Sequence, residues 1–70
     1  MSIEKYRGYV VEGFAKPSGS GDFAALGRVS MDRRAIEESD VLGLYTTREE
    51  AQRHGILWAQ KYVDRLDGSH

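Results

Sequence analysis

The sequence contains no cysteine, one proline and two histidines among its 70 residues. Without cysteine, disulfide bridges, thiolate catalysis and cysteine-ligated metal sites are excluded. Neither sign of charge is in excess, because ten basic and eleven acidic side chains leave a formal net charge of −1. A chain this close to neutrality lacks the basic excess that favours general binding to nucleic acid or anionic membranes.

Long hydrophobic runs are absent as well. The first residues, Met1 to Arg7, contain no apolar stretch, so we expect no signal peptide, no membrane-spanning segment and a cytoplasmic location. Seventy residues predict one domain over residues 1–70, near the lower size limit for a stable core without disulfides or metal.

The sequence also lacks a recognisable set of catalytic residues. His54 is the only internal histidine, and nothing in the pattern brings it near a serine. The neighbouring carboxylates in Glu37-Glu38 and Glu49-Glu50 would point about 100° apart on a helix, so neither pair converges. The segment from Gly19 to Ala24 fits a short dinucleotide-binding pattern, but strand-like rather than helical sequence follows it. We therefore expect no enzyme activity, no cofactor, no metal and no small-molecule ligand.

The last third of the chain predicts one amphipathic helix from Thr47 to Leu66. Thr47 and Glu50 have the spacing of a capping box, in which the Thr47 hydroxyl accepts from the Glu50 amide and the Glu50 side chain reaches back to the Thr47 amide. Gly68 is typical of a helix stop. At about 100° per residue, one side of this helix is apolar, and it comprises Ala51, Gly55, Ile56, Trp58, Ala59, Tyr62, Val63 and Leu66. Leu57 falls on the polar side.

The preceding residues predict three strands, at Gly8–Ala15, Phe23–Met31 and Val41–Thr46. The segments from Lys16 to Gly21 and from Asp32 to Asp40 are expected to be loops. The fold class is therefore α+β, with a three-stranded antiparallel sheet followed by one C-terminal helix packed on one face.

The first two strands allow a register to be predicted. With Val11 opposite Val29, Glu12 faces Arg28 and Phe14 faces Leu26, which places a β-branched pair on one face and an ion pair on the other. The helix would cover the face of Tyr9, Val11, Ala25 and Val29. Close approach of the helix explains why Gly13 and Gly27 face each other, and why Gly55 lies within the helix despite a cost of about 1 kcal/mol.

A single helix leaves the second face of the sheet uncovered. In this register the uncovered face carries Val10, Phe14 and Leu26 beside Glu12 and Arg28, with Tyr6 at its margin. The third strand adds either Leu42 and Leu44 or Tyr45. Exposed apolar surface of this kind marks an interface, and a small chain gains stability by associating. We expect a homodimer or a protein partner bound through Val10, Phe14, Leu26 and Arg28.

Nucleic-acid binding through the sheet and its loops is the alternative. The candidate contacts are Arg7, Lys16, Arg28, Arg33 and Arg34. The slight acidity of the whole chain argues against it, and Arg28 has an expected partner in Glu12.

The segment from Leu44 to Ala51, LYTTREEA, followed by Trp58-Ala59 and Tyr62-Val63, resembles the small N-terminal domain of HicB-type antitoxins. This resemblance covers about half of the chain, and it implies a βββα fold related to double-stranded-RNA-binding topology, with a role in dimerisation and in blocking a partner. More generally, the chain resembles small uncharacterised bacterial βββα proteins.

Overall fold

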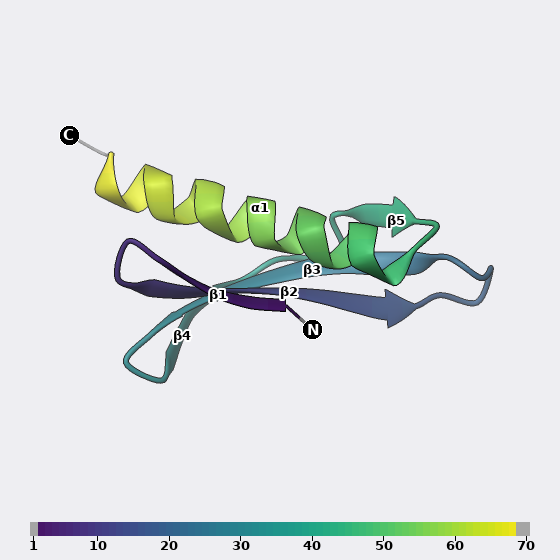
Figure 1. Cartoon of the computed structure of the whole chain (residues 1–70), viewed down its shortest axis with the longest axis horizontal. Coiled ribbons are helices and arrows are strands. Elements are labelled where there is room, and N and C mark those ends of the chain that lie inside the picture. Colours follow the sequence, from purple (N-terminus) through teal and green to yellow (C-terminus); the bar gives the residue numbers. More distant parts are fainter. Residues whose placement is uncertain (1, 69–70) are drawn as a thin grey trace.

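The computed structural model of the protein describes residues 2–68. The chain forms an antiparallel sheet and one long C-terminal helix that lies along one side of it (Figure 1). The elements are β1 (Ser2–Tyr6), β2 (Tyr9–Pro17), β3 (Phe23–Met31), β4 (Arg34–Glu38), β5 (Gly43–Tyr45) and α1 (Arg48–Asp67). The predicted α+β class is confirmed, but the sheet has five strands where the sequence predicted three.

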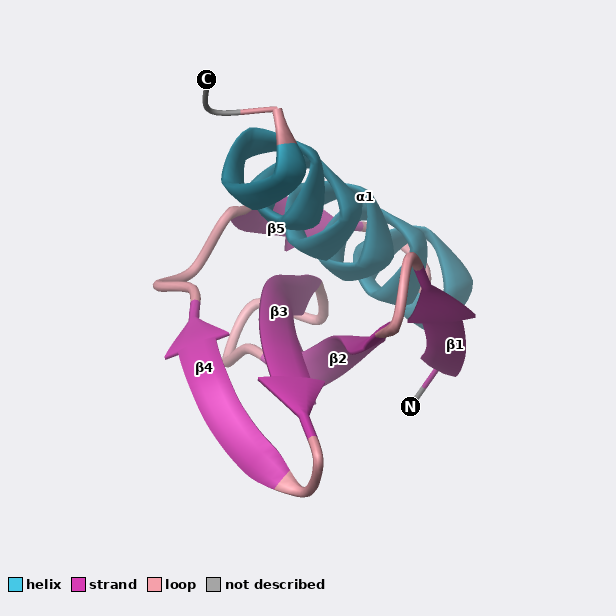
Figure 2. Cartoon of the chain, turned by 90° about the vertical axis from the view of Figure 1, so that its left-hand side faces the viewer, coloured by secondary structure: helices cyan, strands magenta, loops and turns pink. Residues whose placement is uncertain are grey.

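The sheet is a meander with one additional strand. Strands β1, β2, β3 and β4 pair in the order of the sequence, and β5 also pairs with β3. Residues 28–31 of β3 pair with β4, whereas residues 23–25 pair with β5. Helix α1 contacts every strand except β4, and β4 curls away from the helix while β1 lies close to it (Figure 2).

Strands β1 and β4 are the two that the sequence pattern did not reveal. Strand β4 occupies part of the segment from Asp32 to Asp40, which was wrongly expected to be a loop. Each strand joins its neighbour through a two-residue turn with positive φ, at Arg7-Gly8 and at Asp32-Arg33. Such turns favour hairpins, but the second contains no glycine and so lacks the usual signature. The third predicted strand, Val41–Thr46, is shorter and comprises only Gly43–Tyr45.

The predicted register of β2 and β3 is confirmed. Val11 pairs with Val29, Glu12 with Arg28, Gly13 with Gly27 and Phe14 with Leu26. Val11 and Val29 are fully buried beneath the helix, in a core that also contains Ile56, Ala59 and Val63 of α1. The periodicity of β2 and β3 therefore determines which face is covered.

Three glycines allow the helix to approach the sheet closely. A Cβ atom on Gly13 would collide with the Gln52 carbonyl of α1, and one on Gly55 would collide with the Leu26 carbonyl of β3. A Cβ atom on Gly27 would lie 2.6 Å from the Trp58 ring. The prediction that these glycines mark the helix–sheet contact is confirmed.

Helix α1 begins where the capping pattern predicts. Thr47 has an extended backbone, and its hydroxyl accepts a hydrogen bond from the Glu50 amide. The Glu50 carboxylate accepts from the Thr47 hydroxyl at 3.2 Å rather than from the Thr47 amide, so only half of the predicted box is present. At the other end, the Gly68 amide donates to the Asp64 carbonyl and terminates the helix.

Tyr6 lies on the face opposite to the predicted one. Continued alternation from β2 back to Tyr6 would place this residue on the uncovered face. The turn at Arg7-Gly8 instead reverses the chain, so that Tyr6 pairs with Tyr9 on the helix side. Tyr6 packs against the core, and its hydroxyl donates to Asp64 of α1 at 2.8 Å.

Candidate functional site

The candidate site is the sheet face turned away from α1, which we call the open face. Directly opposed residues of neighbouring strands share a face, and successive residues alternate between faces, so the observed register assigns its members. They are Ile3 and Lys5 of β1, Val10, Glu12, Phe14 and Lys16 of β2, Ala24, Leu26, Arg28 and Ser30 of β3, Ala35 and Glu38 of β4, and Leu44 of β5.

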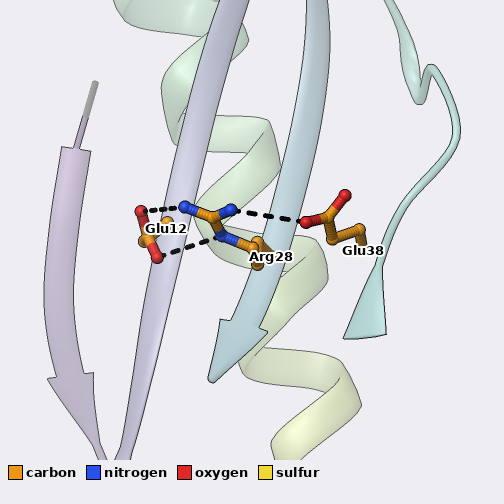
Figure 3. Close-up of polar contacts among 3 residues, drawn as sticks. All are labelled: Glu12, Arg28 and Glu38. Atoms are coloured by element: carbon orange, nitrogen blue, oxygen red, sulfur yellow. Dashed lines mark hydrogen bonds and ion pairs between the residues drawn. The ribbon is translucent and has the colours of Figure 1, made fainter. Parts of the chain in front are cut away.

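An ionic ladder crosses the centre of the open face. Arg28 donates from Nε and Nη2 to the two carboxylate oxygens of Glu12, at 3.2 and 3.1 Å. Its third nitrogen, Nη1, donates to Glu38 of β4 at 3.3 Å (Figure 3). The predicted Glu12–Arg28 pair is therefore confirmed. Glu38 was missed because β4 was expected to be a loop.

The ladder is largely buried on the Glu12 side and packs against an aromatic ring. Glu12 is only 8% exposed, and the Arg28 guanidinium also lies over the Phe14 ring, with 5.1 Å between Cζ and the ring centroid. The hydrogen bonds to Glu12 raise the pKa of Arg28 above its ordinary value, against the smaller opposing effect of burial. Arg28 thus stays protonated, with both carboxylates already using its donors.

Apolar side chains lie beside the ladder. Phe14 and Leu26 are cross-strand partners on β2 and β3, and Val10 lies on the other side of the ladder. Ile3 and Leu44, towards the margins, are 55% and 56% exposed. The recess next to Phe14 and Leu26 has a volume of about 190 Å³, which is below the range of pockets that enclose drug-sized ligands.

The fully buried part of the core beneath the helix consists mainly of valine and alanine side chains, with Ile56 as its largest member. Among residues 2–68, the buried apolar residues are Val11, Ala25, Val29, Ala51, Ile56, Ala59 and Val63. Every leucine and both phenylalanines remain partly or fully exposed. Phe14, Leu26 and Leu44 are not part of this core, and they share the open face.

The five basic residues predicted to contact nucleic acid do not form one surface. Arg7 lies at the β1–β2 turn and pairs with Asp64 of α1 at 3.2 Å, and Arg28 is held in the ladder. Lys16 lies near the β2–β3 connection, at the opposite end of the sheet from the other two turns (Figure 1). Arg33 and Arg34, at the β3–β4 turn, are exposed and have no carboxylate partner within residues 2–68.

Helix α1 and strand β1 together line a second recess of about 380 Å³. His54 is half-buried and stacks on Tyr45 of β5, with ring centroids 4.2 Å apart, a contact that the sequence pattern did not reveal. No three of the metal-ligating side chains within residues 2–68 converge on one point. The helix also lacks the apolar length needed to cross a membrane.

Comparisons with known proteins identify a family and no activity. Neither the curated proteins nor the solved structures contain a significant match to this chain, and the resemblance to HicB-type antitoxins therefore stays a prediction. Residues 1–70 match the family described as "Domain of unknown function (DUF6566)". Because that match extends over the whole sequence, the chain belongs to this family.

Proposed function

We propose that this chain is a non-enzymatic protein-interaction domain that associates with a second copy of itself through the open face. One observation carries the proposal: α1 covers one face of the sheet with a core of valines, alanines and Ile56, while Phe14, Leu26 and Leu44 remain accessible on the other. Accessible apolar side chains that gather on one face are characteristic of interaction sites.

The size of the molecule supports self-association. A stable protein–protein interface buries about 800 Å² on each partner, which is about a sixth of the 4803 Å² of accessible surface on this chain. The open face is one side of a two-layer molecule whose two longest extents are 41 and 23 Å. A chain of 70 residues also buries a smaller fraction of its surface on folding than a larger domain does, so that association adds stability that the core alone does not provide.

Sedimentation velocity over a range of protein concentrations tests this proposal. We expect the wild-type chain to dimerise, and we expect Leu26→Lys to weaken the dimer at least about tenfold because it buries an unpaired ammonium group. The matched control is Leu57→Lys, since Leu57 is 42% exposed on α1 and lies away from the open face. Circular dichroism confirms that each variant folds. A wild-type monomer at every concentration, or equal loss in both variants, contradicts the proposal.

Nucleic-acid binding is the second candidate, and the β3–β4 turn is the observation that favours it. There Arg33 and Arg34 are adjacent, exposed and unpaired among the described residues. If they contact phosphates, the Arg33→Ala/Arg34→Ala variant should reduce the salt dependence of binding by about two phosphate contacts. A labelled duplex titrated at several salt concentrations measures this, with Lys61→Ala on α1 as the control. Failure of the wild-type chain to bind at low salt contradicts this candidate.

A further inference from the structure

The open face contains one row of residues that runs straight across four strands. Ile3 pairs with Glu12, Glu12 with Arg28, and Arg28 with Glu38, so the row passes from β1 to β4 in that order. Its inner members form an anion–cation pair on β2 and β3. Its outer members are accessible, because Ile3 is 55% exposed and the Glu38 side chain is 61% exposed. This asymmetry constrains how two copies can face each other.

A symmetric dimer brings the same surface of both copies together around a two-fold axis. For two sheets that face each other, this axis lies between them, either across the strands or along them. An axis that crosses the strands at the ladder places each strand over its own equivalent, so that Arg28 meets Arg28 of the second copy. An axis along the strands between β2 and β3 reverses the strand order, so that Arg28 meets Glu12 of the second copy.

Charge therefore favours the second arrangement. Stacked sheets lie about 10 Å apart, so the residues that oppose each other across the interface decide which charges meet. Like charges juxtaposed in an interface disfavour the arrangement that produces them. In the other arrangement, Lys5 lies two residues from Ile3 on the same face and can pair with Glu38 of the second copy.

Shape favours the same arrangement. Strand β4 curls away from α1, towards the open side of the sheet, whereas β1 stays close to the helix (Figure 2). An axis across the strands would place the projecting β4 against its own equivalent. An axis along the strands places β4 of one copy over the receding β1 of the other. Phe14 then lies over Leu26 of the second copy.

We infer that the occupant of the open face is a second copy related by a two-fold axis along the strands between β2 and β3, with Arg28 of each copy opposite Glu12 of the other. This arrangement rests on the proposed function and makes it specific. It belongs to the aligned class of sheet packing, in which strand directions differ by about 30°.

A mixing experiment tests the arrangement. Two chains are prepared in a Glu38→Gln background: one is otherwise unchanged, and the other carries Glu12→Arg and Arg28→Glu, which preserves the ion pair within the chain. Each should dimerise with itself. Mixed dimers would oppose Arg28 to the arginine introduced at position 12, so we expect at least about tenfold fewer of them than random pairing gives. Labelling one chain with ¹⁵N lets native mass spectrometry count all three dimers.

The outcomes separate the two proposals. The inferred arrangement is overturned if mixed dimers form as often as random pairing gives. It is also overturned if the chain with Glu12→Arg and Arg28→Glu folds but does not dimerise. Either result leaves association through the open face intact. If the wild-type chain is itself monomeric, the proposed function fails, and the inferred arrangement fails with it.

Cross-linking provides a second measurement that does not alter Glu12 or Arg28. The chain has no cysteine, so a single thiol can be placed on each copy. In the inferred arrangement, a short bismaleimide should link Ile3→Cys copies to Glu38→Cys copies far more than Ile3→Cys copies to each other. Predominant linking between two Ile3→Cys copies would support the axis across the strands and overturn the inference. Leu57→Cys, on α1, should not cross-link.

Discussion

Gly55 lies where α1 comes closest to the sheet, and its replacement by alanine sets helix propensity against packing. A Cβ atom there would collide with the Leu26 carbonyl oxygen, and it would lie 2.8 Å from the Gly13 Cα atom and 3.0 Å from the Leu26 carbonyl carbon. All three are backbone atoms, so no side chain can rotate out of the way. The helix and the sheet must separate locally.

The two contributions to the free energy of unfolding have opposite signs. Alanine favours a helix interior over glycine by about 1 kcal/mol, whereas forcing an additional carbon into a packed interior costs about 1–3 kcal/mol and occasionally more. Because the obstructing atoms belong to backbone on two strands, we expect a cost at the upper end and a net loss of about 2 kcal/mol. For a domain of this size, that loss lowers Tm by roughly 8–16 °C.

Urea denaturation followed by circular dichroism and Trp58 fluorescence measures the change. Gly19→Ala is the matched control, because a Cβ atom at Gly19 meets no atom within 4 Å, and this variant should be neutral or slightly stabilising. If Gly55→Ala is as stable as the wild-type chain or more stable, helix propensity outweighs packing at this contact. The close approach of helix and sheet would then not explain the glycine.

Three further changes test the core, the helix cap and a turn, each by urea denaturation. Val29→Ala removes two methyl groups from a fully buried site and should cost about 2 kcal/mol, and a loss below about 0.5 kcal/mol would show that the core collapses around the gap. Thr47→Ala should cost about 1 kcal/mol by removing the acceptor for the Glu50 amide, whereas Thr47→Ser should restore most of it. Arg33→Gly should stabilise the chain by about 0.5–1 kcal/mol, because φ is 66° there and a left-handed backbone costs non-glycine residues about 1–2 kcal/mol. Destabilisation by this last change would indicate that the Arg33 side chain stabilises the hairpin.

The residues that specify the open face were predictable in part. Val10, Phe14, Leu26 and Arg28 lie where the β2–β3 register placed them, since alternation along two long strands assigns each side chain to a face. Ile3 and Glu38 were not predictable in this way. They reach the open face through β1 and β4, whose sequences, SIEKY and RAIEE, carry no run of alternating apolar residues.

Short charged strands at the sheet margins are stabilised by pairing rather than by their own pattern. Strand β4 is exposed along its whole length and packs only against β3, so its conformation depends on hydrogen bonds to a neighbour that is already in place. Alternation of apolar and polar residues indicates a strand only where one of its faces is buried. It therefore cannot reveal a strand that is exposed on both faces.

The sequence by itself determined the elements whose signals are local. The Thr47 cap, the apolar stripe of α1 and the alternation of β2 and β3 each reflect interactions within a few residues or a repeat of fixed period. Only the tertiary structure decided the number of strands, the side to which Tyr6 turns and the third member of the ladder. These three features depend on chain reversals at two-residue turns. A reversal decides which face each following side chain occupies, and the pattern of neighbouring residues does not specify where the reversal occurs.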